Sequence, residues 1–272
     1  MSQSTYTNVL KRIHAGLEEA RQIFSKYRPG KIAAEYKARH DPVTAADKEL
    51  DAALRKTLLR SGEGWLSEES ADDLSRLRCE RVWVVDPLDG TRELVAGIPE
   101  FCVSIAFVEA GKPVAGAIFN PASNEVFVGS RDFGITYNGK EVRASQRRDL
   151  AGATVLASRS ETARGEWERY RNAPFNIQPM GSVAYKLARV AAGLADATFT
   201  LSPKHEWDIA GGAALVISAG GHIQLPAGGE LICNREPTLL PGLIACGPRL
   251  KDELLQFLSD DLVSSAKRDT RS

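Results

Sequence analysis

Between residues 82 and 146 the chain carries a series of short strand-like segments, and this series constrains the fold more than any other feature. The segments read RVWVV, FCVSIAFVE, KPVAGAIFN, NEVFVGS and ITYNGKEVRAS. Turn residues such as Asn120-Pro121 separate them, and the sequence YNGK at 137–140 is typical of a tight hairpin. Links this short join antiparallel neighbours, because a parallel pair needs a much longer crossover. The series therefore predicts an antiparallel sheet of consecutive strands.

Two amphipathic helices are predicted before this sheet. Apolar residues recur at three- and four-residue steps from Val9 to Tyr27, which indicates one helix face that ends near Pro29-Gly30. A second helix fits residues 44–60, with Thr44 or Asp41 as its N-cap. The N-terminal portion, 1–146, is therefore predicted to be α+β.

After residue 146 strands and helices alternate, which predicts a C-terminal α/β portion over 147–272. The strands expected are ATVLAS, DATFTL and LIAC. The helices expected cover 161–171, 181–195, 207–220 and 248–258.

The charge balance argues against a broad electrostatic surface. The chain of 272 residues has 35 basic and 35 acidic side chains, so we expect neither a nucleic-acid polymer nor a membrane surface as partner. No apolar run approaches the ~20 residues of a membrane span, and the four cysteines form no Cys-x-x-Cys pair. We expect a cytoplasmic protein that acts on a small molecule.

The sequence WVVDPLDGTREL, residues 83–94, ends an apolar strand in two acids. Pro87 fixes one backbone angle and Gly90 permits an unusual one, so this turn can aim two carboxylates and a carbonyl at one point. Oxygen ligands of this kind suit Mg²⁺. The same residues also make an ordinary turn, and the string alone leaves both interpretations open.

Three further acidic strings raise the case for a metal site. Glu68 and Glu69 adjoin in WLSEES, Asp47 falls in the first turn of a predicted helix in DPVTAAD, and Asp208 begins another in HEWDIAGG. Taken singly, each has a structural alternative: a solvated acid pair for the first, and helix capping for the other two.

Together and in this order, DPVTAAD, SEES, DPLDGT and WDIAGG resemble the inositol monophosphatase superfamily of Mg²⁺-dependent, Li⁺-sensitive phosphatases. The resemblance runs from about residue 5 to 258. It implies a layered αβαβα sandwich with most metal ligands in the N-terminal portion. The C-terminal portion would contribute Asp208 and the segments that determine specificity.

The resemblance also assigns roles to residues. The implied ligands for two or three Mg²⁺ ions are Glu68, Asp86, the Leu88 carbonyl, Asp89 and Asp208. Asp47 and Thr91 match the pair that activates water, Glu69 would support the ligands, and the Gly90 and Thr91 amides would hold the phosphate. Mn²⁺ is expected to substitute for Mg²⁺, and Li⁺ to inhibit.

Three segments bear on the substrate. The strings TREL and SRS are most similar to CysQ-type 3'(2'),5'-bisphosphate nucleotidases, and neither Thr200 nor Leu201 supplies the acid that binds inositol in many relatives. The substrate contacts implied are Gly90, Thr91, Arg92, Ser158, Arg159, Gly181, Ser182, Lys186 and Lys204. As alternatives, Arg92 would pair with Glu93 or Glu100 at the surface, and Lys186 would lie on a solvated helix face.

The predicted function is a metal-dependent phosphomonoesterase that hydrolyses adenosine 3',5'-bisphosphate to AMP and phosphate, as a monomer or homodimer. Inositol-1-monophosphatase or another sugar-phosphate phosphatase is the alternative. A non-catalytic binding module would predict losses in the acidic set, yet Asp47, Glu68, Asp86, Asp89 and Asp208 are all present.

Overall fold

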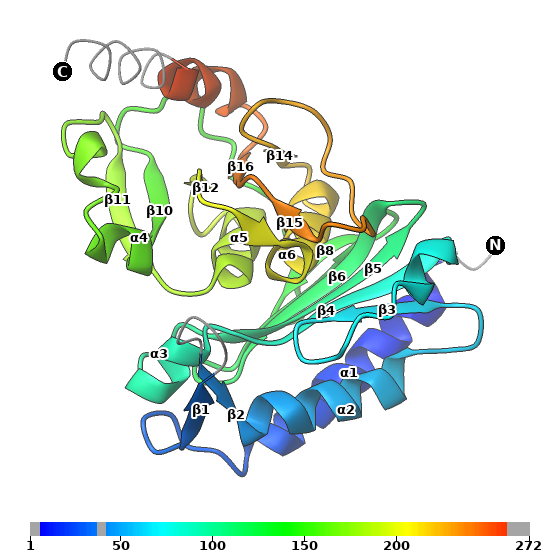
Figure 1. The fold of residues 1–272 in the computed structure, drawn as a ribbon. Helices are drawn as coiled ribbons and strands as arrows, with labels where there is room; N and C mark the ends of the chain where they lie inside the picture. The colour runs from blue at the N-terminus through cyan, green and yellow to red at the C-terminus, as the bar shows by residue number, and fades with distance from the viewer. Residues whose placement is uncertain (1–5, 37–41, 260–272) are drawn as a thin grey trace.

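The computed structural model describes residues 6–36 and 42–259 as five alternating layers of helix and sheet (Figure 1). Helices α1 (Thr7–Phe24) and α2 (Ala45–Leu58) form the first layer. A seven-stranded sheet follows, then helices α5 (Val183–Ala191) and α6 (Glu206–Ser218). A five-stranded sheet and a helix at 251–259 complete the sandwich, which confirms the predicted αβαβα fold.

The large sheet has the order β3-β4-β5-β6-β7-β8-β9. Its strands are β3 (Gly64–Ser67), β4 (Arg81–Asp89), β5 (Cys102–Glu109), β6 (Lys112–Asn120), β7 (Glu125–Ser130), β8 (Gly134–Tyr137) and β9 (Lys140–Val142). From β4 to β9 each strand pairs antiparallel with the next, as predicted. Only the short β3, which the sequence analysis did not predict, runs parallel to its neighbour.

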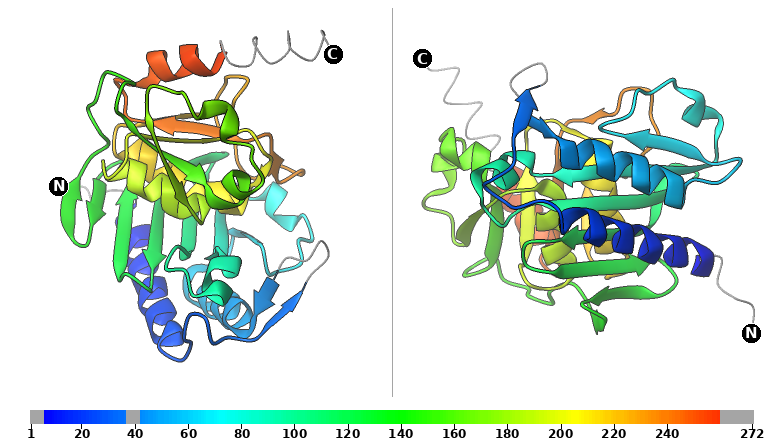
Figure 2. Two further views of the ribbon diagram at one scale, coloured as in Figure 1. Left: turned by 90° about the vertical axis from the view of Figure 1, so that its left-hand side faces the viewer. Right: turned by 90° about the horizontal axis from the view of Figure 1, so that it is seen from below.

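Successive side chains of β4 point to opposite faces of the sheet, so the strand packs against two helical layers. Trp83 and Val85 are buried against α1 and α2, whereas Val82 and Val84 belong to the core beneath α5 and α6. Figure 2 shows α1 and α2 lying side by side across one face of this sheet. The strand is apolar on both faces because helices cover both.

The second sheet has the order β11-β10-β12-β16-β14. Its strands are β10 (Thr154–Ser158), β11 (Asn176–Met180), β12 (Ala197–Thr200), β14 (His222–Gln224) and β16 (Leu243–Cys246). Helices α5 and α6 belong to the later portion of the chain but pack directly on the large sheet of the earlier one (Figure 1). The division of the chain into two portions near residue 146 stays a prediction.

The remaining elements are short. They are β1 (Ala34–Tyr36), β2 (Pro42–Thr44), η2 (Ser75–Arg78), α3 (Thr91–Ala96), α4 (Arg159–Ala163), η3 (Glu168–Tyr170), β13 (Lys204–His205) and β15 (Leu239–Leu240). Among the residues described, no helix combines the length and the apolar character that crossing a membrane requires.

Two sequence predictions need correction. The helix expected over 161–171 is broken into α4 and η3, because Gly165 takes a left-handed backbone angle between them. The first helix ends at Phe24 rather than near Pro29-Gly30. Thr44 does cap α2, whereas the alternative cap, Asp41, lies outside the described residues.

Candidate active site

The turn at the end of β4 departs from regular sheet pairing. Asp86 pairs with Ser104 and Asp89 with Cys102, so Pro87 and Leu88 form a bulge between them. Such an irregularity bends a strand and redirects its side chains. The Leu88 amide donates to Asp86 Oδ1 at 2.9 Å, which fixes the buried carboxylate in the turn.

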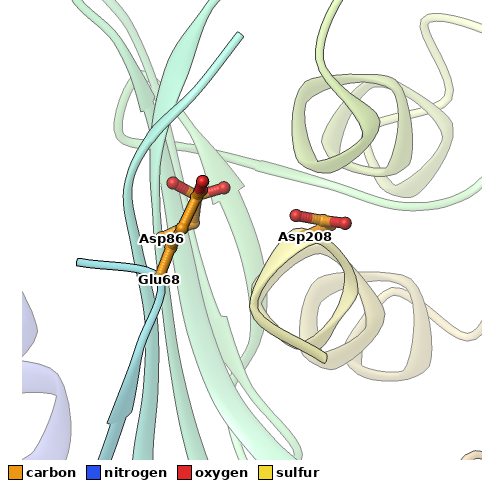
Figure 3. A group of neighbouring side chains, drawn as sticks. All are labelled: Glu68, Asp86 and Asp208. Carbon is orange, nitrogen blue, oxygen red and sulfur yellow. The ribbon is translucent and has the colours of Figure 1, made fainter. Parts of the chain in front are cut away.

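Three carboxylates from separate elements converge in front of this turn. Glu68 follows β3, Asp86 lies on β4 and Asp208 on the first turn of α6, and each offers an oxygen within 4.8 Å of the others. Figure 3 shows Glu68 and Asp86 side by side, with Asp208 facing them across the gap. The sequence analysis predicted all three as metal ligands, and the structure brings them together.

Charge repulsion makes this cluster a good cation site. Burial and the charges of Glu68 and Asp89 raise the pKa of Asp86 well above its ordinary value. Burial and the charges of Asp89 and Glu68 do the same to the pKa of Asp208. A bound divalent cation would reverse both effects, because it stabilises the ionised carboxylates. Three carboxylates so close together therefore fit a hard ion such as Mg²⁺.

Asp47 and Thr91 form a second polar unit beside the cluster. The Thr91 hydroxyl lies 3.1 Å from Asp47 Oδ1 and 3.0 Å from the Leu88 carbonyl oxygen. Asp47 Oδ2 accepts hydrogen bonds from the Thr44 amide and hydroxyl, which close a capping box at the start of α2. The capping reading of Asp47 is thus correct, and its other oxygen still reaches Thr91 as the sequence analysis predicted.

Asp89 joins the turn to α5. Its Oδ2 atom accepts hydrogen bonds of 2.7 Å from both the Ser182 hydroxyl and the Ala184 amide. The Ser182 hydroxyl also accepts from the Tyr185 amide, so the helix start is fixed from both sides. Asp89 lies outside the close trio of carboxylates, although its charge raises the pKa of Asp86 and of Asp208.

A cavity of about 250 Å³ opens over these groups. It is lined by fourteen of the residues predicted for the site, namely Glu68, Asp86, Leu88, Asp89, Gly90, Thr91, Arg92, Ser158, Arg159, Gly181, Ser182, Lys186, Lys204 and Asp208. Asp47 reaches the cavity through Thr91. Glu69 does not line it.

The chain is similar in sequence to known proteins. A sequence profile of the Inositol monophosphatase family matches residues 4–262. The chain belongs to this family. It is 32% identical over 248 residues to Nus factor SuhB of Escherichia coli strain K12, covering 88% of this chain and 91% of that protein.

Two further matches widen the comparison. Inositol monophosphatase 3 of Solanum lycopersicum is 31% identical over 239 residues, with 83% of this chain and 87% of that protein covered. The crystal structure of CysQ from Bacteroides thetaiotaomicron, a bacterial member of the family, has a TM-score of 0.74 and 28% identity, covering 90% of this chain and 99% of that one. Members of this family are metal-dependent phosphatases, and this chain is a phosphatase of the same family.

The cavity of the phosphatase is also lined by two lysines, Lys186 and Lys204. Lys186 is 3% exposed, and its ammonium group donates to the Ser182 and Met180 carbonyls at 3.0 and 3.4 Å. Burial lowers the pKa of Lys186 to about 8. The alternative that placed Lys186 on a solvated helix face is therefore wrong. The ammonium group of Lys204 lies 3.4 Å from Glu161 Oε1.

Two arginines reach the cavity in different ways. Arg159 donates from Nε and Nη2 to the carboxylate of Glu100, which also accepts from the Gly181 amide at 2.7 Å. This contact engages much of the Arg159 guanidinium. Arg92 is exposed at the rim. Glu100, which the sequence offered with Glu93 as a partner for Arg92, is bonded to Arg159 and Gly181.

Several residues at this site were not foreseen. Glu93 and Ser160 line the cavity, and Glu100 and Glu161 hold cationic side chains at its wall. For Glu93 the available signal was its place within the string TREL, directly after Arg92. Glu100 lies 59 residues from Arg159 in the sequence, so no local pattern could reveal that pair.

Proposed function

We propose that the phosphatase is a Mg²⁺-dependent 3'(2'),5'-bisphosphate nucleotidase that hydrolyses adenosine 3',5'-bisphosphate to AMP and phosphate. One observation carries this proposal: the same cavity is lined by a trio of carboxylates and by two lysines, Lys186 and Lys204. The acids suit cations that bind the phosphate to be cleaved. The lysines suit a second anionic group on the same molecule.

Glu68, Asp86 and Asp208 would hold the first Mg²⁺, and Asp89 and the Leu88 carbonyl would complete a set for two or three ions. Bound Mg²⁺ supplies charge neutralisation at the phosphoryl oxygens and lowers the pKa of a water molecule. Mn²⁺ would substitute for Mg²⁺, and Li⁺ would inhibit by taking one of the cation positions. Glu69 would support this set from outside the cavity.

Thr91 and Asp47 would act on the attacking water. The Thr91 hydroxyl lies between the Asp47 carboxylate and the Leu88 carbonyl at the cavity, where its oxygen would accept a proton from water as it attacks. Asp47, fixed by Thr44, then receives a proton from Thr91. No side-chain nucleophile is needed in this scheme.

The phosphate would rest on the amides of Gly90 and Thr91. Gly90 adopts a φ of 99°, and a Cβ atom there would lie only 3.0 Å from the Glu100 carbonyl oxygen. Glycine is therefore required at this turn, which packs directly against the backbone of Glu100 and Phe101. Arg92, Ser158, Arg159, Gly181 and Ser182 would complete the substrate contacts around the cavity.

The site of Thr200 supports a nucleotide rather than inositol. Thr200 is buried and bonded to Glu161, whose carboxylate is already paired with Lys204. An acid able to bind sugar hydroxyls is therefore not presented here. Structural similarity to CysQ agrees with this assignment.

Inositol-1-monophosphatase activity is the second candidate, favoured by the similarity to inositol monophosphatase 3 of Solanum lycopersicum. A phosphate-release assay with Mg²⁺ separates the two candidates. Adenosine 3',5'-bisphosphate, inositol 1-phosphate and fructose 1,6-bisphosphate would be compared side by side, with and without Li⁺. We expect the highest kcat/KM for the nucleotide. A clear preference for inositol 1-phosphate would overturn the proposed substrate and leave the metal site in place.

A further inference from the structure

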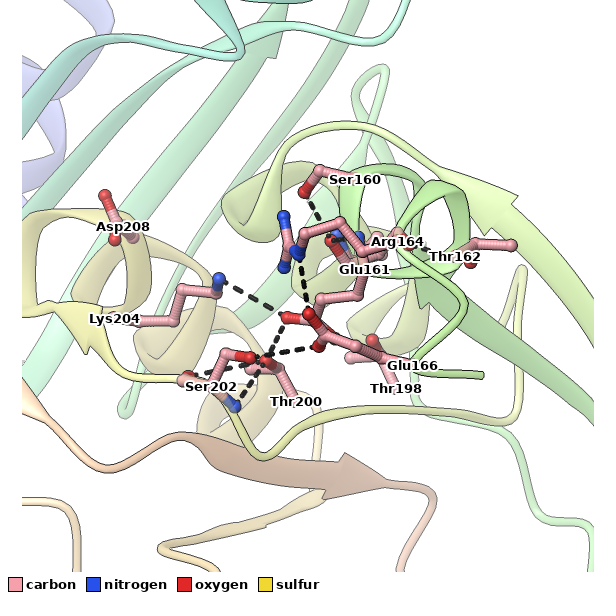
Figure 4. Close-up of polar contacts among 12 residues, drawn as sticks. Ser160, Glu161, Thr162, Arg164, Glu166, Thr198, Thr200, Ser202, Lys204 and Asp208 are labelled. Carbon is pink, nitrogen blue, oxygen red and sulfur yellow. Dashed lines mark hydrogen bonds and ion pairs between the residues drawn. The ribbon is translucent and has the colours of Figure 1, made fainter. Parts of the chain in front are cut away.

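Lys204 has two carboxylates within its surroundings, Asp208 at the metal site and Glu161. Lys204 lies four residues before the metal-site acid Asp208, and both residues line the cavity. Burial and the charges of Asp89 and Glu68 raise the pKa of Asp208, and the positive charge of Lys204 opposes that rise. Figure 4 nevertheless shows the ammonium group directed at Glu161 rather than at Asp208, and the two charged atoms are 3.4 Å apart.

Glu161 is held firmly enough to keep Lys204 in this position. Its side chain is 3% exposed, and it lies in the first turn of α4, where its amide donates to the Ser158 hydroxyl. The Thr200 hydroxyl donates to Oε1 and the Trp167 indole to Oε2 at 3.3 Å. These neutral donors orient the carboxylate, and Lys204 supplies the positive charge that a buried carboxylate needs.

A lysine without this partner would compete with the metal. The carboxylates of Asp208 and Glu68 would attract an ammonium group that was able to turn toward them, because opposite charges in a poorly solvated site interact strongly. An ammonium placed there would repel a divalent cation from the same oxygens. Glu161 prevents this competition because its carboxylate forms the ion pair with Lys204.

We propose that Glu161 is a positioning residue, which holds Lys204 away from the metal-binding acids and presents its ammonium group to a second phosphate of the substrate. The second half of this statement rests on the proposed nucleotidase function. The two lysines line the same cavity, and the pKa of Lys186 is lowered by burial, raised by Asp89 and lowered by the charge of Lys204. A substrate with a second phosphate would bind between them.

Metal binding without substrate tests the first half. Mn²⁺ would be titrated into the protein, with free Mn²⁺ followed by electron paramagnetic resonance. We expect Glu161→Gln to weaken Mn²⁺ binding by about tenfold, because Lys204 then turns toward the acids. Adding Lys204→Met to Glu161→Gln should restore binding close to that of the unmodified protein, since the competing charge is gone.

Glu166→Gln is the matched control, because Glu166 lies five residues further on, is exposed and pairs with Arg164. It should bind Mn²⁺ as the unmodified protein does. Thr200→Val offers a milder change should Glu161→Gln fold poorly, since it removes one hydrogen bond to Glu161, and it should weaken binding in the same direction. Unchanged binding in the folded variants would overturn the proposal, as would a loss in Glu161→Gln that Lys204→Met fails to restore.

Substrate kinetics test the second half. Adenosine 3',5'-bisphosphate and adenosine 3'-monophosphate share the phosphate to be cleaved and differ in the second one. At saturating Mg²⁺ we expect Glu161→Gln to raise KM for the bisphosphate alone, with kcat little changed. An equal rise for both substrates would refute the contact with a second phosphate. If the unmodified protein turns over neither nucleotide, the nucleotidase function fails, while the Mn²⁺ comparison still decides whether Glu161 positions Lys204.

Discussion

At the scale of single residues, Asp47 uses one carboxylate oxygen for the helix cap and the other for its contact with Thr91. Oδ2 accepts the hydrogen bonds of Thr44, and Oδ1 lies within hydrogen-bonding distance of Thr91. Capping at the start of α2 and positioning at the site are therefore separable by mutation. The sequence analysis treated the two roles as alternatives, and the structure shows that the geometry of one supports the other.

Asp47→Asn should abolish most activity and leave the protein folded. An amide cannot receive the proton from Thr91, so we expect kcat to fall by about 10²–10⁴. Thr44→Ala is the matched control: it removes the cap, costs about 1 kcal/mol of unfolding free energy and keeps the contact between Asp47 and Thr91. Thermal unfolding and phosphate release would be measured on both. Comparable kcat losses in the two variants would remove the catalytic role of Asp47.

Site residues could be recognised from the sequence where they lie close to one another along the chain. The turn that carries Asp86, Gly90 and Thr91 was recognised because its residues are contiguous, and the family resemblance then assigned their roles. Glu161 and Glu100 were missed because their partners, Lys204 and Arg159, lie on other elements. The burial of Lys186 was also missed, since it depends on how α5 packs rather than on helix periodicity.

At the scale of elements, α6 positions Asp208 through close packing at two glycines. A Cβ atom on Gly212 would lie 2.4 Å from Leu187 Cβ on α5, and one on Gly211 would lie 2.5 Å from Ser104 Oγ on β5. The helix thus approaches both neighbours more closely than any side chain would allow. These distances show that the small residues after Asp208 serve close packing.

Gly212→Ala should disturb folding and metal binding together. The added methyl forces α5 and α6 apart, which should cost about 1–3 kcal/mol of unfolding free energy and raise the Mg²⁺ concentration needed for half-maximal activity. Ala213→Gly on the same helix is the control, because it costs about 1 kcal/mol through helix propensity without separating the helices. Its Mg²⁺ requirement should stay unchanged. If Gly212→Ala only lowers stability, the helix spacing does not determine the metal site.

Helices and strands were predicted correctly from the sequence where their hydrophobic pattern is regular. The meander from β4 to β9 has alternating apolar residues and short turns, and it was predicted in order. The strand β3 was missed because only Trp65 and Leu66 in it are large apolar residues, and β11 because it carries Pro179 and exposed polar residues. The helix expected over 161–171 was broken by a single glycine, whose backbone angle depends on its surroundings.

At the scale of the whole molecule, the layers bring the acids together. Glu68 and Asp86 come from the large sheet, and Asp208 comes from the helical layer that packs on it (Figures 1 and 3). More than a hundred residues of chain separate Asp86 from Asp208. Their convergence was inferred from family resemblance, because neither spacing nor periodicity can bring such distant residues together.

The central claim is that these three carboxylates hold a divalent cation. A crystal grown with Mn²⁺ would test it most directly, through the anomalous scattering of the metal. We expect an anomalous peak within coordination distance of oxygens of Glu68, Asp86 and Asp208. A map with no peak between them, or with the three side chains turned apart while Mn²⁺ binds elsewhere, would contradict it.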